Sequence, residues 1–159
     1  MSLLHTLKIS ATAPLQSKNN KRLVEMENYS SAAVRHWKDA ELLARENRVE
    51  NADHHYGFAA ECAIKKVLVV FPAFSTSGVL NSSYKQHINS LWDKVTHQSL
   101  QKSYPQLFAI LKVTNAFSDW DVNQRYFVDG AVTSAALASH KKITSRLLGA
   151  VNLSGKRGV

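Results

Sequence analysis

The stretch NADHHYGFAAECAIKKVLVVFP, residues 51–72, decides the fold of this 159-residue chain. Apolar residues cover most sides of a helix drawn through it, and Pro72 would end that helix. A helix that is apolar nearly all round normally lies at the centre of a bundle. We therefore predict a central helix over about Ala52–Phe71, with Asn51 as its cap. Small residues would let neighbouring helices approach it closely: Gly57, Ala59, Ala60 and Ala63.

Helical periodicity extends on both sides of this stretch. Before it, apolar residues recur every three or four positions over about Leu23–Glu46, which predicts a first long helix. After it, we expect two shorter helices, over about 85–96 and from Pro105, and a last helix over about 131–150. Only six glycines and three prolines occur, which favours few turns and long helices. The expected fold is all-α, an up-and-down bundle of about five helices in residues 23–150.

The positive charge of the chain is concentrated at its two ends. The formal net charge is +8, and residues 1–24 contain four bases and no acid. Residues 141–159 contain five bases and no acid, so residues 25–140, with 11 bases and 12 acids, carry −1. We therefore expect a near-neutral bundle between a basic N-terminal tail or loosely docked segment, 1–22, and a basic C-terminal tail, 151–159. This distribution excludes a fold that is a basic nucleic-acid cradle throughout.

Composition also predicts a soluble, cytoplasmic chain without membrane contact. The longest strongly apolar run, Val67–Phe74, is far shorter than a membrane span and contains Pro72. His5 and Lys8 interrupt any apolar segment of a signal peptide. Cys62, the only cysteine, cannot form an internal disulfide, and its apolar neighbours are typical of an inert buried thiol.

The first cluster of chemically active residues lies on the central helix. His54, Glu61 and Lys65 fall on one helical stripe, where they could bind phosphate or transfer a proton. The alternative is an exposed face that carries a Glu61–Lys65 ion pair and a surface histidine. No glycine-rich phosphate loop and no G-x-S-x-G nucleophile motif occurs in the chain.

The second cluster is the aromatic segment 117–129, which shows no helical period. Arg125 beside Tyr126 and Trp120 can hold a phosphate while an aromatic ring stacks on a base. The alternative is a loop pinned by Trp120 in the core, with Arg125 paired to an aspartate. The sequence leaves these two interpretations open.

The histidines lack the spacing of a recognised metal site. His54 and His55 are adjacent, so on a helix they would point about 100° apart. No H-x3-H pair and no second cysteine exists, and His87, His97 and His140 form no known ligand pattern. We therefore expect no metal site and no cofactor.

Four segments taken together resemble the HEPN domain superfamily over about residues 30–150. They are Trp37-x2-Ala40-x2-Leu43, Ala60-Glu61-Cys62-Ala63-x-Lys65, Lys85-Gln86-His87-Ile88-x2-Leu91 and Trp120-x4-Arg125-Tyr126. The resemblance implies a bundle of about five helices that dimerises and takes part in RNA or nucleotide chemistry. It also implies a toxin–antitoxin or other defence system, with a separately encoded nucleotidyltransferase or antitoxin as partner.

The ribonucleases of this superfamily carry an arginine, then four to six residues, then a histidine, late in the bundle. Arg125 aligns with that arginine, but positions 130–132 read Gly-Ala-Val and offer no histidine. Arg48 followed by His54 or His55 satisfies the spacing, although it lies at the start of the central helix, away from the usual place.

The expected function is therefore RNA or nucleotide binding by a homodimer. The sequence leaves open whether the chain is also an enzyme. The resemblance and the two clusters place four residues in the binding site: Glu61, Lys65, Arg125 and Tyr126. A metal-independent ribonuclease that uses Arg48, His54 and His55 is one alternative. A protein-interaction scaffold without catalysis is the other.

Overall fold

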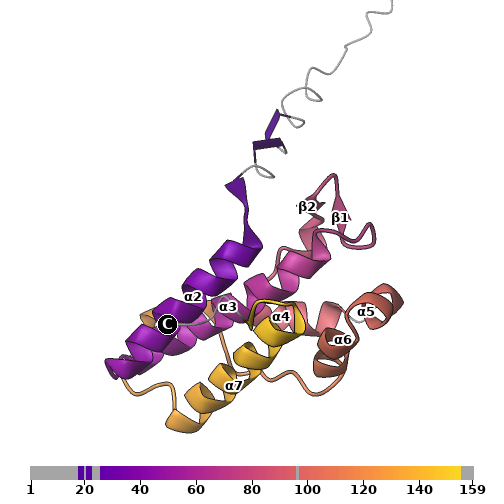
Figure 1. The fold of residues 1–159 in the computed structure, drawn as a ribbon. Coiled ribbons are helices and arrows are strands. Elements are labelled where there is room, and N and C mark those ends of the chain that lie inside the picture. The colour runs from indigo at the N-terminus through magenta and orange to yellow at the C-terminus, as the bar shows by residue number, and fades with distance from the viewer. Residues whose placement is uncertain (1–17, 20, 23–25, 96, 155–159) are drawn as a thin grey trace, which may run out of the picture.

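The computed structural model describes residues 18–19, 21–22, 26–95 and 97–154, and it is a bundle of packed helices (Figure 1). The predicted all-α class, with about five helices, is confirmed. The α-helices are α2 (Tyr29–Arg45), α3 (Val49–Leu68), α4 (Ile88–Leu91), α5 (Gln98–Ser103), α6 (Pro105–Leu111) and α7 (Ser134–Ala150). Three 3-10 helices, η1 (Ser82–Tyr84), η2 (Trp92–Lys94) and η3 (Val122–Tyr126), and a hairpin of β1 (Ser75–Thr76) and β2 (Val79–Leu80) complete the fold.

Helix α3 is the centre of the bundle, as its apolar composition predicts. Helices α2, α7 and α4 and the short η3 all pack against it, and Figure 1 shows α2 and α3 side by side. Gly57 lets Trp120, just before η3, lie directly on α3, because a Cβ atom at Gly57 would lie 2.2 Å from the indole Cε2 of Trp120. The indole Nε1 of Trp120 also donates a hydrogen bond to the Asp53 carbonyl oxygen at 3.1 Å. The aromatic segment is therefore fixed directly on α3.

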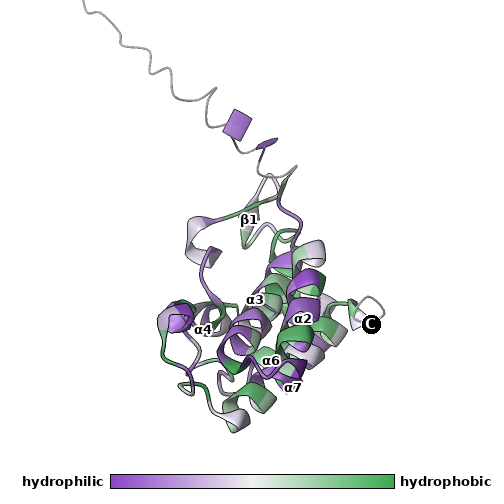
Figure 2. Cartoon of the chain, turned by 90° about the vertical axis from the view of Figure 1, so that its left-hand side faces the viewer, coloured by the Kyte–Doolittle hydropathy of each residue, from purple (hydrophilic) through white to green (hydrophobic). Residues whose placement is uncertain are grey.

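Helix α2 begins at a clear cap and buries one face. The side chain of Asn28 accepts a hydrogen bond from the backbone N–H of Ser31, which satisfies a free donor of the first turn. Hydrophilic and hydrophobic residues alternate along α2 in Figure 2, and Ala33, Trp37 and Ala40 are buried. The predicted start of this helix at Leu23 lies outside the described residues, as does most of the predicted tail 1–22.

Several predicted helix boundaries are wrong. Helix α3 starts at Val49 with Arg48 as its N-cap, so Asn51 lies inside the first turn and does not cap it. It ends at Leu68, before the predicted Phe71, because a residue that precedes proline avoids the helical conformation. In place of one helix over 85–96, His87 caps the short α4, which continues as η2.

The predicted loop between the second and third helices contains a hairpin that the sequence pattern did not indicate. Ser75 of β1 pairs with Leu80 of β2, and Ser77 and Gly78 turn the chain with φ of 51° and 75°. Helix α5 was also not predicted. Its six residues are too few for a helical period to be read from the sequence.

The packed part of the chain continues beyond the predicted bundle end at residue 150. Val151 and Leu153 are buried, so they belong to the core and not to a tail. Asn152 takes a φ of 62°, and the N–H of Leu153 returns to the Leu148 carbonyl at 2.8 Å. Residues 155–159 of the predicted tail lie outside the described part. No helix in the described part is long and apolar enough to cross a membrane.

Candidate functional site

Four histidines surround the ring of Phe58 and form what we call the histidine face. His54 and His55 lie on α3, His36 faces them from α2, and His87 precedes α4. Their ring centroids lie 4.4 Å, 6.3 Å, 5.3 Å and 6.3 Å from that of Phe58, in that order. Side chains from three segments that are distant in sequence therefore meet on one side of the bundle.

Glu61 links Lys65 to His87 on this face. Lys65 Nζ donates to Glu61 Oε1 at 2.7 Å, and His87 Nδ1 lies 3.1 Å from Glu61 Oε2. The predicted Glu61–Lys65 ion pair is confirmed, but both side chains are buried, so the prediction of an exposed face is wrong. When the carboxylate accepts the Nδ1–H of His87, the Nε2 of that ring remains as the acceptor. The His87 side chain is 48% exposed, so this nitrogen belongs to the accessible part of the site.

His54 is buried and electrically neutral near pH 7. Its ring stacks on Trp120 with centroids 5.5 Å apart, and among the described residues its Nδ1 has no hydrogen-bond partner. Burial lowers the pKa of His54 to about 4, and the positive charges of His55, Arg125 and His87 act in the same direction, against Asp53. A ring of such low basicity is a weak proton acceptor at pH 7, which argues against its predicted role as general base.

The second cluster contains a buried tryptophan and an exposed arginine–tyrosine pair. Trp120 is buried, as one of the two interpretations of this segment predicts. Arg125 and Tyr126 are exposed, and the guanidinium carbon lies 4.7 Å from the centre of the Tyr126 ring. The predicted pairing of Arg125 with an aspartate is not found among the described residues. The η3 helix that contains the pair packs on α3, and the charge of Arg125 contributes to the lowered pKa of His54, so Arg125 lies toward the histidine face.

Arg48 lies apart from the histidines with which it was grouped. It caps the start of α3 and lines an open pocket of about 530 Å³, together with Glu50, Asp129 and Gly130. Neither His54 nor His55 lines that pocket, and no hydrogen bond joins them to Arg48 in the described part of the chain. The three residues predicted to form one catalytic unit are therefore divided between two places.

A buried polar network joins α3 to α7 and η3, and no spacing in the sequence predicted it. His140 Nδ1 lies 2.7 Å from Asp53 Oδ1, and His140 Nε2 lies 3.0 Å from Asp119 Oδ1. Gln124 Nε2 donates to Asp53 Oδ2 at 2.8 Å. Burial alone would lower the pKa of His140, but the hydrogen bonds and charges of the two aspartates outweigh it and raise that pKa. We call these four residues the Asp53 network.

One sequence signal could have indicated the buried position of His140. It lies four residues before Thr144 and seven before Leu147, on the face of α7 that enters the core. The fully buried residues of α7 are in fact two polar ones, His140 and Thr144, and two leucines, Leu147 and Leu148.

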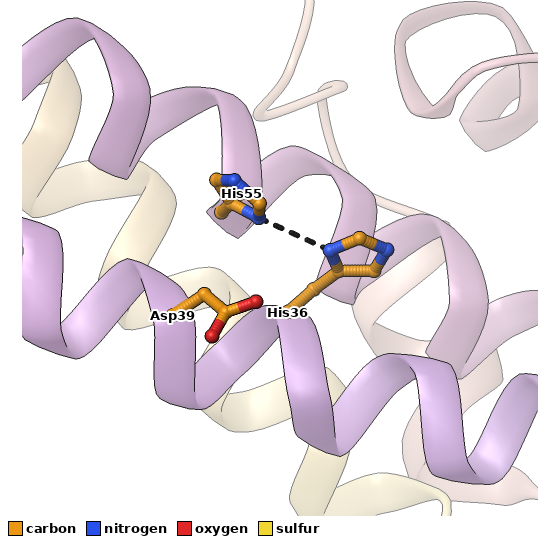
Figure 3. A group of neighbouring side chains, drawn as sticks. All are labelled: His36, Asp39 and His55. Atoms are coloured by element: carbon orange, nitrogen blue, oxygen red, sulfur yellow. Dashed lines mark hydrogen bonds between the residues drawn. The ribbon is translucent and has the colours of Figure 1, made fainter.

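The histidine face contains a second close group, shown in Figure 3. Nδ1 of His36 and Nδ1 of His55 lie 3.1 Å apart, so one ring donates to the other. Asp39 is one helical turn from His36, and one ligand atom from each of the three residues lies within 4.8 Å of the others. Spacing along the chain gave no hint of this group, because α2 and α3 contribute to it from opposite sides.

Cys62 has the properties of the inert thiol that the sequence predicts. It is only partly exposed, and burial raises the pKa of its thiol to about 12, aided by the negative charge of Glu61. The thiolate, which is the reactive form, is therefore scarce at neutral pH.

Comparisons of this chain with known protein families, with curated proteins and with solved structures found no match to any of them.

Proposed function

We propose that this chain is a HEPN-like helical protein that binds RNA or a nucleotide as a homodimer. We further propose that it acts with a separately encoded partner, such as an antitoxin or nucleotidyltransferase, in a toxin–antitoxin or other defence system. The resemblance described above supports the proposal, and so does the confirmed all-α bundle. The observation that carries it is the exposed Arg125–Tyr126 pair, in which Arg125 lies toward the histidine face.

The Arg125–Tyr126 pair offers a phosphate contact and a base contact side by side. Tyr126 is 74% exposed, and the adjacent Phe127 and Val128 are exposed too, so this contiguous apolar stretch is a candidate contact surface. No carboxylate in the described part of the chain neutralises Arg125, so its donors remain available to a phosphate. A nucleotide base stacked on the Tyr126 ring would place its phosphate near the guanidinium.

The backbone that carries this pair is held in place. The side chain of Asp121 accepts from the N–H of Asn123, and Gln124 completes a capping box at the start of η3. Gln124 is buried and donates to Asp53, which ties η3 to α3. A preorganised pair loses less entropy on binding than one on a free loop.

The two other residues predicted to bind the ligand act indirectly in this proposal. Glu61 and Lys65 are buried, and each neutralises the charge of the other, so neither offers a free charge to a phosphate. Glu61 instead orients His87, whose exposed Nε2 can accept a hydrogen bond from a ribose hydroxyl.

Fluorescence anisotropy with a labelled single-stranded RNA and with labelled ATP, across a salt series, tests the proposal. We expect binding that weakens as salt increases, because phosphate contacts release counterions. Tyr126→Ala should lose about 1–3 kcal/mol of binding free energy, the usual value of a stacked base. Arg125→Ala should weaken binding and make it less dependent on salt.

The chain offers a matched control for these variants. Lys112 lies over the ring of Phe108 at 5.6 Å, so it is a second cation–aromatic pair away from the histidine face. Lys112→Ala should leave binding unchanged. Absence of binding at low salt by the native chain would contradict the proposal, and a stable complex with another protein would then favour the scaffold alternative.

A metal-independent ribonuclease is the second candidate, and one observation favours it. His87 is held by a buried carboxylate and exposes its other ring nitrogen, which is the arrangement of an oriented general base. In this reaction His87 Nε2 would accept the proton of the ribose 2′-hydroxyl, and the 2′-oxygen would attack the adjacent phosphorus while Arg125 stabilises the added charge. The P–O5′ bond would break, the 5′-oxygen would leave as an alcohol with a proton from water, and a 2′,3′-cyclic phosphate would remain.

Digestion of total RNA in EDTA tests this second candidate. Cleavage should disappear in His87→Asn and persist in His97→Asn, in which asparagine can still cap α5 as the native histidine does. Cleavage that survives in His87→Asn but is lost in His54→Phe would restore the original assignment of His54. An unchanged RNA ladder at high protein concentration would exclude the ribonuclease.

A further inference from the structure

We propose that His36, Asp39 and His55 bind one divalent transition-metal ion of the zinc class between α2 and α3. Its three ligands share no residue with the His87–Glu61 pair or with Arg125 and Tyr126, although His36, His55 and His87 all contact the Phe58 ring. Figure 3 shows the three side chains pointing toward one another from the two helices.

The distances within the group are also close to those of a metal site. Two imidazole nitrogens bound to one tetrahedral zinc ion, at about 2.0–2.1 Å each, lie about 3.3 Å apart. Nδ1 of His36 and Nδ1 of His55 already lie 3.1 Å apart. A carboxylate oxygen of Asp39 lies within 4.8 Å of a ring nitrogen of each histidine, so all three residues present ligand atoms to one small space.

The composition of the group selects the class of ion. Two imidazoles and one carboxylate suit zinc and its neighbours in the first transition row. Calcium and magnesium require a shell made mostly of oxygen atoms, which this group does not provide. All three residues are only half-buried, so solvent can supply the remaining coordination position.

The protonation state of the two histidines is suited to coordination, which requires neutral imidazole. Burial lowers the pKa of both rings. The neighbouring Arg35 adds to this effect at His36, and the negative charge of Asp39 opposes it at both rings. The lowered basicity of both rings means that few protons compete with a metal ion for their nitrogens near neutral pH.

The two helices hold the ligands in place before any ion binds. Trp37 packs its ring against Tyr56 at 5.5 Å, and the Tyr56 hydroxyl donates to Glu41 at 2.5 Å. Both contacts lie just C-terminal to the histidine pair on α2 and α3, so they hold the two helices together next to the site. An ion here would join α2 to α3 and stabilise their pairing.

Calorimetric titration of the EDTA-treated full-length chain with Zn²⁺, and visible absorption with Co²⁺, test the site. We expect one ion per chain, a cobalt spectrum of low coordination number and a higher melting temperature in the presence of zinc. His36→Asn and His55→Asn should each weaken binding more than about 100-fold, because the loss of a residue that merely orients a ligand costs about 10- to 100-fold.

Two further variants make the result decisive. Asp39→Asn keeps the size of the side chain and removes its charge, so it should weaken zinc binding while leaving the metal-free melting temperature almost unchanged. His97→Asn removes a histidine outside the group and should bind zinc as the native chain does. Equal affinity in the native chain and in a His36→Asn/His55→Asn double variant, or no binding by either, would overturn the proposal.

Discussion

The Asp53 network and the histidine face both involve α3, yet they use their polar atoms in opposite ways. In the network, both ring nitrogens of His140 and both carboxylate oxygens of Asp53 have partners. On the histidine face, His54 Nδ1 has none among the described residues, and His36 and His55 share one hydrogen bond. A polar group whose capacity is filled by the chain stabilises the fold, whereas one with unused capacity is available for a ligand.

The largest expected effect comes from breaking the filled network. Asp53→Asn leaves the cationic His140 buried with only the exposed Asp119 as a charged partner, and its amide group opposes the donor of Gln124. Loss of one partner from a buried ion pair costs about 3–5 kcal/mol of unfolding free energy. Urea denaturation measures this loss. Asp129→Asn, at an exposed aspartate, should change stability by less than about 0.5 kcal/mol.

The second effect is a pH dependence of the free energy of unfolding, which has opposite signs in the two regions. In the folded chain the pKa of His54 is lowered from about 6.5 to about 4 by burial, so this ring stabilises the fold above pH 6.5. As the pH falls from 6.5 to 4 the unfolded chain takes up the proton first, and about 3 kcal/mol of stability is lost. His54→Phe keeps an aromatic ring without a titrating group. It should flatten the stability profile in this range, measured by urea denaturation at each pH.

His140 should show the opposite response. Its pKa is raised in the folded chain, so its contribution is complete below pH 6.5 and is lost as the pH rises through the folded value. His140→Gln should remove this loss on the alkaline side and leave the acid side, to which His36, His54 and His55 contribute, in place. If both variants alter the same side of the profile, the contrast between the two regions is wrong.

The third effect concerns Gly57, where the aromatic segment crosses α3. In Gly57→Ala the new Cβ would overlap the rigid indole of Trp120, so we expect a loss of about 1–3 kcal/mol, as for other overpacked cores. Thermal and urea unfolding measure it. Gly149→Ala is the matched control in α7, because its Cβ would meet only the Ser154 hydroxyl at 3.2 Å. That change should stay within about 1 kcal/mol, helped by the higher helix propensity of alanine.

The sequence predicted the bundle because its signals are local. The apolar stretch that became α3 and the periods that became α2 and α7 reflect burial of neighbouring residues along one segment. The predicted start of α3 is wrong because it too was taken from a local signal, the capping preference of Asn51. Asn51 is a common capping residue, but helical hydrogen bonds already begin at the Arg48 carbonyl, three residues earlier.

The candidate site was predicted only in part because its contacts are long-range. Nineteen residues separate His36 from His55, and 87 separate Asp53 from His140. No spacing rule joins such positions, since the geometry of packed helices decides which side chains meet. Glu61 and Lys65 were paired correctly because they are one helical turn apart, whereas their burial depends on segments distant in sequence, such as the one that contains His87.

The smallest effect separates the two carboxylates that hold His140. Asp119 is 62% exposed, so water competes for its hydrogen bond with His140 Nε2, whereas Asp53 is buried. Asp119→Asn should therefore cost less than about 1 kcal/mol. A double-mutant cycle of Asp119→Asn with His140→Gln measures the coupling directly. A coupling as large as the loss in Asp53→Asn would mean that the exposed arm contributes as much as the buried one. The burial of Asp53 would then not make it a stronger partner of His140 than the exposed Asp119.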